Sequence, residues 1–232
     1  MTEKILNFKN KEKYTVSDIA ELVEILRGEG GCAWDREQTH ESIRNAMIEE
    51  TYEFIEGLDA KDDELMEEEL GDVIFQVFFH ARIADERGGF DIDDVADGIC
   101  KKMVLRHPHV FGDVTVANSA EVLKNWEEIK KSEKNRDSVK KDLESVPAVL
   151  PSLIRAEKLL SRFKKNGGKV EKDTSVLVSD LKNAVNALGD TVSSDEMGEI
   201  LFKLANLTYA SDINAEQALY DKNEKFVKEN SK

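Results

Sequence analysis

The chain has 232 residues, of which 40% are hydrophobic and 35% are charged, and its formal net charge is −15. This composition is typical of a globular protein in aqueous solution, and the negative charge argues against a general nucleic-acid-binding function. No apolar run approaches the roughly 20 residues needed to cross a bilayer. Residues 1–4 lack a signal-peptide pattern and the two cysteines form no disulfide framework, so we expect a cytoplasmic protein without a membrane partner.

Apolar residues at helical spacing, together with only three prolines, predict an all-α fold. We expect residues 1–14 to be frayed and the glycine-rich residues 28–35 to form a loop. Capping residues and helix-ending glycines then set the bounds of the first helices. They are predicted at about residues 15–28, 39–58, 63–86 and 91–106, with a further helix that begins near Asn118.

Two of these helices carry pairs of acidic residues beside apolar ones. Glu50 and Glu53 lie on one helix and Glu69 and Asp72 on the next, and residues three apart point to nearly the same side. A carboxylate beside a core costs several kcal/mol unless it is paired or bound to a metal. Residues 49–72 contain twelve acidic residues and one basic residue, Lys61, so local ion pairs cannot neutralise the four.

A divalent cation can neutralise such a group, because hard ions such as Mg²⁺ prefer carboxylate oxygens and also bridge to substrate phosphates. The alternative for any single acidic run is a solvated helix face. The paired spacing within two helices that also carry apolar rows favours the metal site.

Basic and aromatic residues elsewhere are candidates for binding the rest of a nucleotide. Lys102 and Arg106 lie four residues apart at a helix end, where they either interact favourably with the helix dipole or contact phosphates. Trp126 and Lys130 have the same spacing, which suits stacking of a base and contact with a phosphate, although Trp126 can also be a core residue. Trp34 in the glycine-rich loop is either a satellite core residue or a platform for a ligand ring.

A charged segment without an apolar row divides the chain. We place a first domain at residues 1–134, a linker at residues 135–150 and a second domain at residues 151–232. Helices are predicted in the second domain at about residues 151–165, 174–188, 193–210 and 214–229.

The second half repeats the helical plan of the first. Residues 196–202 resemble residues 69–75, and upstream Asp180 and Asn183 fall about where Glu50 and Glu53 would be expected. Since Asn183 cannot supply a carboxylate, the acidic set of this copy is incomplete. We therefore expect catalysis, if present, to reside in the first half.

Together these motifs resemble the MazG family of nucleoside triphosphate pyrophosphohydrolases, within the all-α NTP pyrophosphatase group. The two acidic motifs of the family stand here as Glu49-Glu50-x-x-Glu53 and Glu68-Glu69-x-x-Asp72. Similarity extends to residues 32–39 and 106–111 and to the segment from Trp126 to Lys130. It covers about residues 17–134 strongly and residues 147–229 more weakly.

The resemblance implies two tandem MazG-like helical-bundle modules, the second degenerate, in a protein that forms a homodimer. It implies Mg²⁺, with Mn²⁺ as a substitute, and hydrolysis of an NTP or dNTP to the monophosphate and pyrophosphate in nucleotide-pool housekeeping. The residues that it assigns to catalysis and metal binding are Glu50, Glu53, Glu69 and Asp72. The residues that it assigns to the triphosphate are Lys102, Arg106 and Lys130, with Trp126 near the nucleotide.

Two other functions remain open from the residues. A carboxylate-bridged di-iron protein uses Glu-x-x-His pairs on two of its helices, whereas the second motif here ends in Asp72 and His80 lies eight residues further on. A non-catalytic module would bind a nucleotide without cleaving it. Detection of monophosphate and pyrophosphate after incubation with an NTP and Mg²⁺ separates the three functions.

Overall fold

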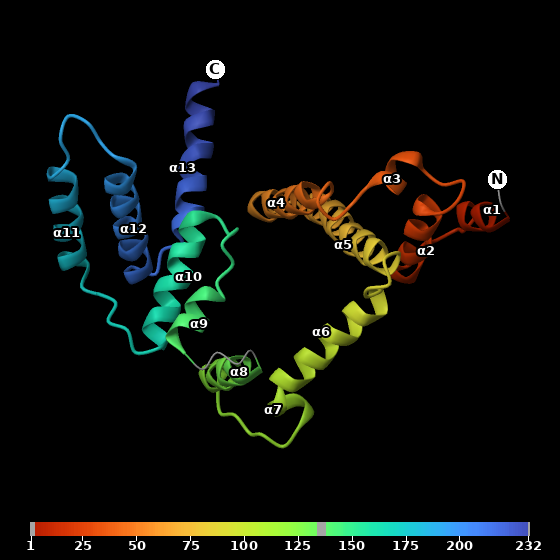
Figure 1. Ribbon diagram of the computed structural model, residues 1–232, viewed down its shortest axis with the longest axis horizontal. Coiled ribbons are helices and arrows are strands. Elements are labelled where there is room, and N and C mark those ends of the chain that lie inside the picture. Colours follow the sequence, from red (N-terminus) through yellow and green to blue (C-terminus); the bar gives the residue numbers. More distant parts are fainter. Residues whose placement is uncertain (1–2, 134–137, 232) are drawn as a thin grey trace. The chain divides into compact units, whose positions relative to one another are not determined.

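The computed structural model describes residues 3–133 and 138–231, and every regular element in these ranges is a helix (Figure 1). The all-α prediction is therefore confirmed. The chain divides into two compact units, Met1–Ala117 and Asn118–Lys232. None of the helices in the described ranges is both long and apolar enough to cross a membrane.

The first unit contains the four helices predicted before residue 107 and three short ones that we did not predict. Its helices are α1 (Glu3–Lys9), α2 (Val16–Arg27), α3 (Ala33–Glu37), α4 (Arg44–Ala60), α5 (Asp63–Asp85), α6 (Ile92–Arg106) and α7 (Pro108–Phe111). The expectation of a frayed N-terminus is wrong for α1. Its residue Phe8 packs against Tyr14 in a tilted ring contact, with ring centroids 5.0 Å apart, and the Tyr14 hydroxyl donates to the Phe8 carbonyl at 3.0 Å.

Side-chain caps set several helix ends as the sequence predicted. Thr15 begins α2 with a reciprocal capping box, and Asp91 begins α6 in the same way. In contrast, α4 begins at Arg44 and not near residue 39. The reason is a local turn in which Thr39 and Ser42 bond each other's backbone N–H groups, at 2.9 and 3.3 Å, which competes with helix formation.

The glycine-rich segment is also more ordered than a plain loop, because it folds back on the end of α2. The Cys32 N–H donates to the Leu26 carbonyl at 2.8 Å, and α3 follows directly. A Cβ on Gly31 would lie only 2.4 Å from that same carbonyl oxygen, so a larger residue cannot occupy this close approach. The predicted loop is thus wrong for the part that forms α3.

The core of this unit lies where α2, the start of α4 and the second half of α5 meet. Its buried members are Val23, Ile43, Phe79 and Ile83, against which Phe75 and other partly buried residues pack. Helices α4 and α5 pack against each other, and the turn that joins them places Lys61 in the left-handed conformation, with φ of 56°. This hairpin positions the acidic residues of the two helices.

The apolar side chains that recur along α6 at helical spacing are only partly buried. Ile92 and Met103 are half-buried, whereas Val95 and Ile99 are exposed. Within the first unit α6 packs on the end of α5 and on α7, so one side of this helix has apolar side chains in solvent.

The second unit confirms the four helices predicted for the second half of the chain. Its helices are α8 (Ser119–Glu133), α9 (Val139–Glu144), α10 (Ser152–Lys165), α11 (Thr174–Asn186), α12 (Ser194–Ala210) and α13 (Ala215–Asn230). Helix α12 packs against α10 and α11, and the buried apolar residues of the unit include Leu160, Leu177, Ile200 and Ala205.

The predicted linker differs from the structure in one part. Residues 134–137 lie outside the described residues, but residues 139–144 form α9, capped by Ser138. Asp142 of α9 is buried and accepts hydrogen bonds from Arg162 and Asn166 of the second unit, so this part of the segment is not an extended linker. The domain boundary after residue 134 stays a prediction.

Candidate active site

Helices α4 and α5 bring three of the four predicted acidic residues together. Glu50 of α4 and Glu69 and Asp72 of α5 each offer a carboxylate oxygen, and these oxygens all lie within 4.8 Å of one another. Glu50 and Asp72 lie at comparable distances along the chain from the α4–α5 turn. The helical hairpin therefore places them side by side, at the same level along the two helices. Glu69 lies one turn before Asp72 on the same helix.

The environment of this acidic cluster disfavours negative charge. Burial raises the pKa of Glu69, and the charges of Glu53, Asp72 and Glu50 raise it further. Burial also raises the pKa of Glu50, with added contributions from Asp72 and Glu53. Glu53 is exposed and is not one of the three clustered ligands, but its charge acts on both of these carboxyl groups.

The cluster fits a divalent cation by its donor set. Glu69 is 7% exposed, and its Oε2 is buried without a hydrogen-bond partner, which is costly unless something else binds it. Three oxygen donors of this hardness are the ligands that Mg²⁺ and Mn²⁺ take in proteins. A bound cation would relieve the mutual repulsion of Glu50, Glu69 and Asp72.

The other predicted residues of the first unit lie on α3 and α6. Lys102 is exposed on α6, whereas Arg106, the last residue of that helix, is buried. Trp34 of α3 is 63% exposed, so its ring does not fill the core of this unit. The structure therefore leaves the ring accessible to a ligand.

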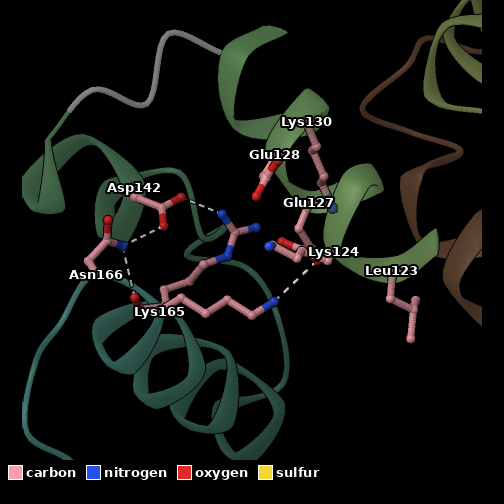
Figure 2. Close-up of a pocket in the computed structure, with 9 residues that line it drawn as sticks. Leu123, Lys124, Glu127, Glu128, Lys130, Asp142, Lys165 and Asn166 are labelled. Atoms are coloured by element: carbon pink, nitrogen blue, oxygen red, sulfur yellow. Dashed lines mark hydrogen bonds and ion pairs between the residues drawn. The ribbon is translucent and has the colours of Figure 1, made fainter. Parts of the chain in front are cut away.

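Trp126 and Lys130 form a pair on α8, which belongs to the second unit. The Lys130 ammonium lies over the Trp126 ring, 4.3 Å from its centroid, as expected for a cation–π contact. Lys130 also lines a cavity of about 450 Å³ (Figure 2). On the wall of this cavity the Lys165 ammonium pairs with Glu127 at 3.2 Å and thereby connects α10 to α8.

The acidic residues of the second half serve different purposes. The Glu196 carboxylate accepts hydrogen bonds from the Ser193 N–H at 2.8 Å and from its hydroxyl at 2.7 Å, in the capping box of α12. These bonds lower the pKa of Glu196, whereas that of Glu69 is raised. Glu199 pairs with Lys203 at 3.1 Å, and Asp180 and Asn183 are exposed. Among the described residues, no metal-ligand cluster forms around Glu196.

Sequence reasoning missed three polar features of the first unit. His40 and His80 approach each other at 2.7 Å between their Nδ1 atoms, and burial lowers the pKa of His80. Gln76 is buried, and its Oε1 has no hydrogen-bond partner. Arg27 donates to backbone carbonyls and to Glu86. No local signal predicts the His40–His80 contact or the contacts of Arg27, since the partners are far apart in the chain or belong to the backbone.

Comparison with known proteins identifies the family. The family model described as "MazG nucleotide pyrophosphohydrolase domain" matches residues 38–111, a span that contains all four predicted acidic residues. The nucleoside triphosphate pyrophosphohydrolase/pyrophosphatase MazG of Thermotoga maritima is 39% identical over 213 residues, which are 90% of this chain and 82% of that protein. The chain belongs to the MazG family.

Two further relatives bear on the extent of the MazG similarity. The nucleoside triphosphate pyrophosphohydrolase of Escherichia coli (strain K12) is 38% identical over 208 residues, 85% of this chain and 78% of that protein. The uncharacterized protein YabN of Bacillus subtilis (strain 168) is 52% identical over 143 residues, 62% of this chain. The matched region spans 29% of the length of YabN.

Proposed function

We propose that the chain hydrolyses nucleoside triphosphates, both NTPs and dNTPs, to the monophosphate and pyrophosphate, as part of nucleotide-pool housekeeping. Two of the MazG relatives described above carry the name nucleoside triphosphate pyrophosphohydrolase. The single structural observation that supports this proposal best is the cluster of Glu50, Glu69 and Asp72, with a buried Glu69 oxygen that lacks a partner.

The proposed reaction depends on Mg²⁺, which Glu50, Glu69 and Asp72 would hold, with Glu53 beside them. When bound, Mg²⁺ neutralises charge on the triphosphate and polarises a phosphoryl oxygen. The carboxylates fix the place of the reacting phosphate near α4 and α5. Their negative charge also disfavours binding of the anionic substrate in the absence of the cation.

Positive side chains supply the remaining contacts to the triphosphate in this proposal. Lys102 and Arg106 of α6 donate charge-assisted hydrogen bonds to phosphate oxygens. Trp34 of α3 offers an aromatic face on which a nucleobase stacks. The assignment of Trp126 and Lys130 to the nucleotide is carried by the family resemblance. The exposure of Trp34 and Lys102 supports their part in this assignment.

We further propose that the second half is a degenerate MazG-like module without activity of its own and that the chain forms a homodimer. The use of Glu196 as a helix cap supports the first statement. The exposure of Val95 and Ile99 on α6 supports the second, because apolar side chains in a helical row gain stability when a second copy covers them.

Product analysis over a panel of substrates tests the proposed reaction. Each common NTP and dNTP is incubated with the protein and Mg²⁺, and the products are separated by anion-exchange chromatography. We expect monophosphate and pyrophosphate in equal amounts, and no turnover in EDTA. Release of diphosphate and inorganic phosphate would contradict the proposal. Nucleotide binding without any product would favour the non-catalytic module, and stoichiometric iron after purification would favour the di-iron protein.

A further inference from the structure

Trp34 lies on a helix too short to hold its own shape. Helix α3 has five residues, and isolated helices of this length are unstable in water because nucleation costs more than a few hydrogen bonds return. Contacts with the rest of the first unit must therefore hold α3, and with it the backbone that carries the exposed Trp34 side chain. The structure shows which side chain makes these contacts.

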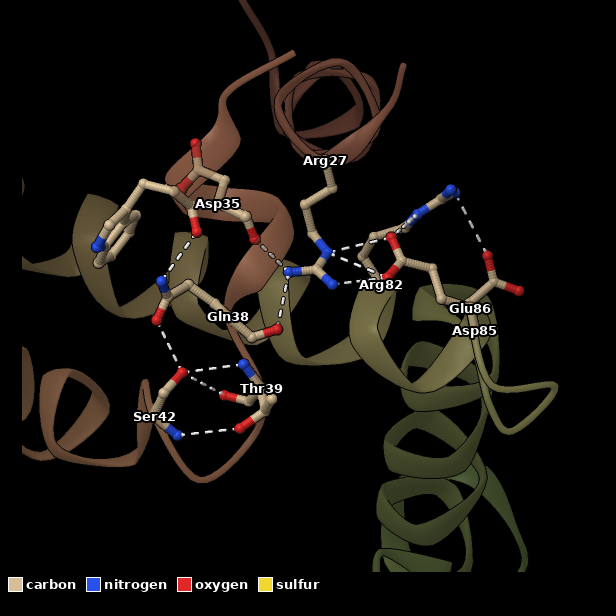
Figure 3. Close-up of polar contacts among 9 residues, drawn as sticks. Arg27, Asp35, Gln38, Thr39, Ser42, Arg82, Asp85 and Glu86 are labelled. Carbon is tan, nitrogen blue, oxygen red and sulfur yellow. Dashed lines mark hydrogen bonds and ion pairs between the residues drawn. The ribbon is translucent and has the colours of Figure 1, made fainter. Parts of the chain in front are cut away.

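Arg27, the last residue of α2, bonds the end of α3 (Figure 3). Its side chain is 5% exposed, and its Nη1 donates to the backbone carbonyls of Asp35 at 2.5 Å and Gln38 at 3.1 Å. These carbonyls lie at the C-terminal end of α3, that of Asp35 within the helix and that of Gln38 at its cap, where carbonyls have few backbone donors and positive charge is favourable. Arg27 thus completes the hydrogen bonding of the helix that carries Trp34.

The other side of the same guanidinium reaches α5. Arg27 Nε and Nη2 donate to the Glu86 carboxylate at 3.1 and 2.6 Å, and Arg82 Nε holds that carboxylate at 3.0 Å (Figure 3). The guanidinium also lies 5.2 Å from the centroid of the Phe79 ring in the core. Glu86 follows directly on α5, the helix that carries Glu69 and Asp72.

Side-chain bonds within the segment extend this connection to Trp34 and to the turn before α4. Gln38 Nε2 donates to the Trp34 carbonyl at 2.9 Å, and the Ser42 hydroxyl donates to Gln38 Oε1 at 2.7 Å (Figure 3). Arg27 therefore fixes the backbone around Trp34 relative to the two helices that carry the acidic cluster.

We propose that Arg27 is a positioning residue that holds Trp34 as the stacking surface for the nucleobase, at a fixed place relative to the acidic cluster. This inference rests on the proposed function and assigns its base-recognition element. Arg27 does not touch the substrate and acts through α3. A lysine cannot replace it, because only the planar guanidinium donates to two carbonyls on one side and a carboxylate on the other.

The test compares a substrate that has a base with one that lacks it. Arg27→Lys and the wild type are assayed with ATP and with ribose 5-triphosphate, which carries the triphosphate but no base. We expect KM for ATP to rise about tenfold in Arg27→Lys, the order of one base–aromatic stack, with kcat within about twofold of the wild type. Both constants for ribose 5-triphosphate should stay unchanged.

A double-mutant cycle identifies the route of the effect. Trp34→Ala alone should raise KM for ATP by about the same factor, and Arg27→Lys in the Trp34→Ala background should add little, because both changes remove one interaction. Arg82→Lys is the matched control, since Arg82 contacts Glu86 but donates to no described carbonyl of α3. Because Arg82 reaches α3 only through Glu86, KM for ATP should rise far less in Arg82→Lys than in Arg27→Lys.

A second variant keeps the test decisive if Arg27→Lys does not fold. Glu86→Gln retains the guanidinium and weakens its anchor, so it should raise KM for ATP in the same direction by a smaller factor. Equal losses on ATP and ribose 5-triphosphate, a loss in kcat alone or unchanged kinetics would overturn the inference. Absence of wild-type turnover on both substrates would instead contradict the proposed function, and with it this inference.

Discussion

Glu69 and Asp72 show how far two similar residues on one helix can differ. They lie three residues apart on α5, yet Glu69 is buried and Asp72 is exposed. The spacing of the acidic residues predicted that they share a side of the helix, and the structure brings both into one cluster with Glu50. The solvent exposure of each side chain could not be predicted, because it depends on how α4 packs against α5. The exposure of Glu53 depends on the same packing.

Glu69→Gln should not destabilise the metal-free protein at neutral pH. Folding raises the pKa of Glu69 above its ordinary value of 4.5, so the folded state binds this proton more tightly than the unfolded state. The contribution of Glu69 to metal-free stability therefore falls as the pH rises from about 4 through the raised pKa. In EDTA at pH 7 we expect Glu69→Gln to melt at or above the wild-type temperature, with a smaller difference near pH 4. A variant that melts well below the wild type at pH 7 would show that the Glu69 charge is stabilised by the fold.

Lys102 and its neighbour Lys101 allow a matched test of phosphate contact. Lys101 pairs with Asp97 on the surface of α6, whereas Lys102 is one of the proposed triphosphate ligands. Charge-assisted hydrogen bonds contribute about 1.5–3 kcal/mol, so Lys102→Ala should lower kcat/KM about ten- to hundredfold. Lys101→Ala should leave kcat/KM within about twofold. Equal kinetics of the two variants would remove Lys102 from the substrate site.

At the scale of elements, the long helices were predictable and the short ones were not. Local signals such as the caps at Thr15 and Asp91 and the apolar rows lie within each long helix. The short helices α3 and α9 depend on side chains outside their own segments, Arg27 for α3 and Arg162 for α9. No pattern within five or six residues contains that information, so both segments were predicted as irregular.

Asp142 is the residue on which we expect α9 to depend most. It is buried and accepts hydrogen bonds from Arg162 and from Asn166, the latter at 2.8 Å. Removal of one partner of a buried ion pair costs about 3–5 kcal/mol, so Asp142→Ala should lower the free energy of unfolding of the second unit by about this amount. Urea denaturation measures the change. Lys140→Ala, at an exposed pair with Glu144, should change it by less than about 1 kcal/mol, and equal effects would contradict the role of Asp142.

At the scale of the whole molecule, the sequence predicted two similar helical halves with unequal acidic sets. The helices of the second half lie where they were predicted. The position of Glu196 explains in part why the acidic residues of the two halves behave differently. It lies in the first turn of α12, where its carboxylate caps the helix, whereas Glu69 lies well inside α5. The sequence alignment of the two runs could not show this difference, because it depends on where each helix begins.

The proposed homodimer makes Ile99 a sensitive position. Ile99 is 44% exposed on α6, so Ile99→Glu should change the stability of an isolated chain by no more than about 0.5 kcal/mol. If a second copy covers α6, the buried glutamate would instead weaken association strongly. We expect sedimentation velocity to show a dimer for the wild type and a larger monomer fraction for Ile99→Glu. A wild-type monomer at micromolar concentration would contradict the proposed homodimer.

The most direct test of the account compares Glu69 with its counterpart in the second half. Glu69→Gln and Glu196→Gln remove the same charge from corresponding runs of sequence, and turnover of an NTP with Mg²⁺ is measured as pyrophosphate release. We predict that Glu69→Gln lowers kcat/KM by at least about a hundredfold, because it removes a proposed metal ligand. Glu196→Gln should retain wild-type turnover, and a glutamine at this position can still accept the Ser193 hydrogen bonds of the capping box. Loss of turnover in Glu196→Gln with activity kept in Glu69→Gln would contradict the assignment of the active site to α4 and α5.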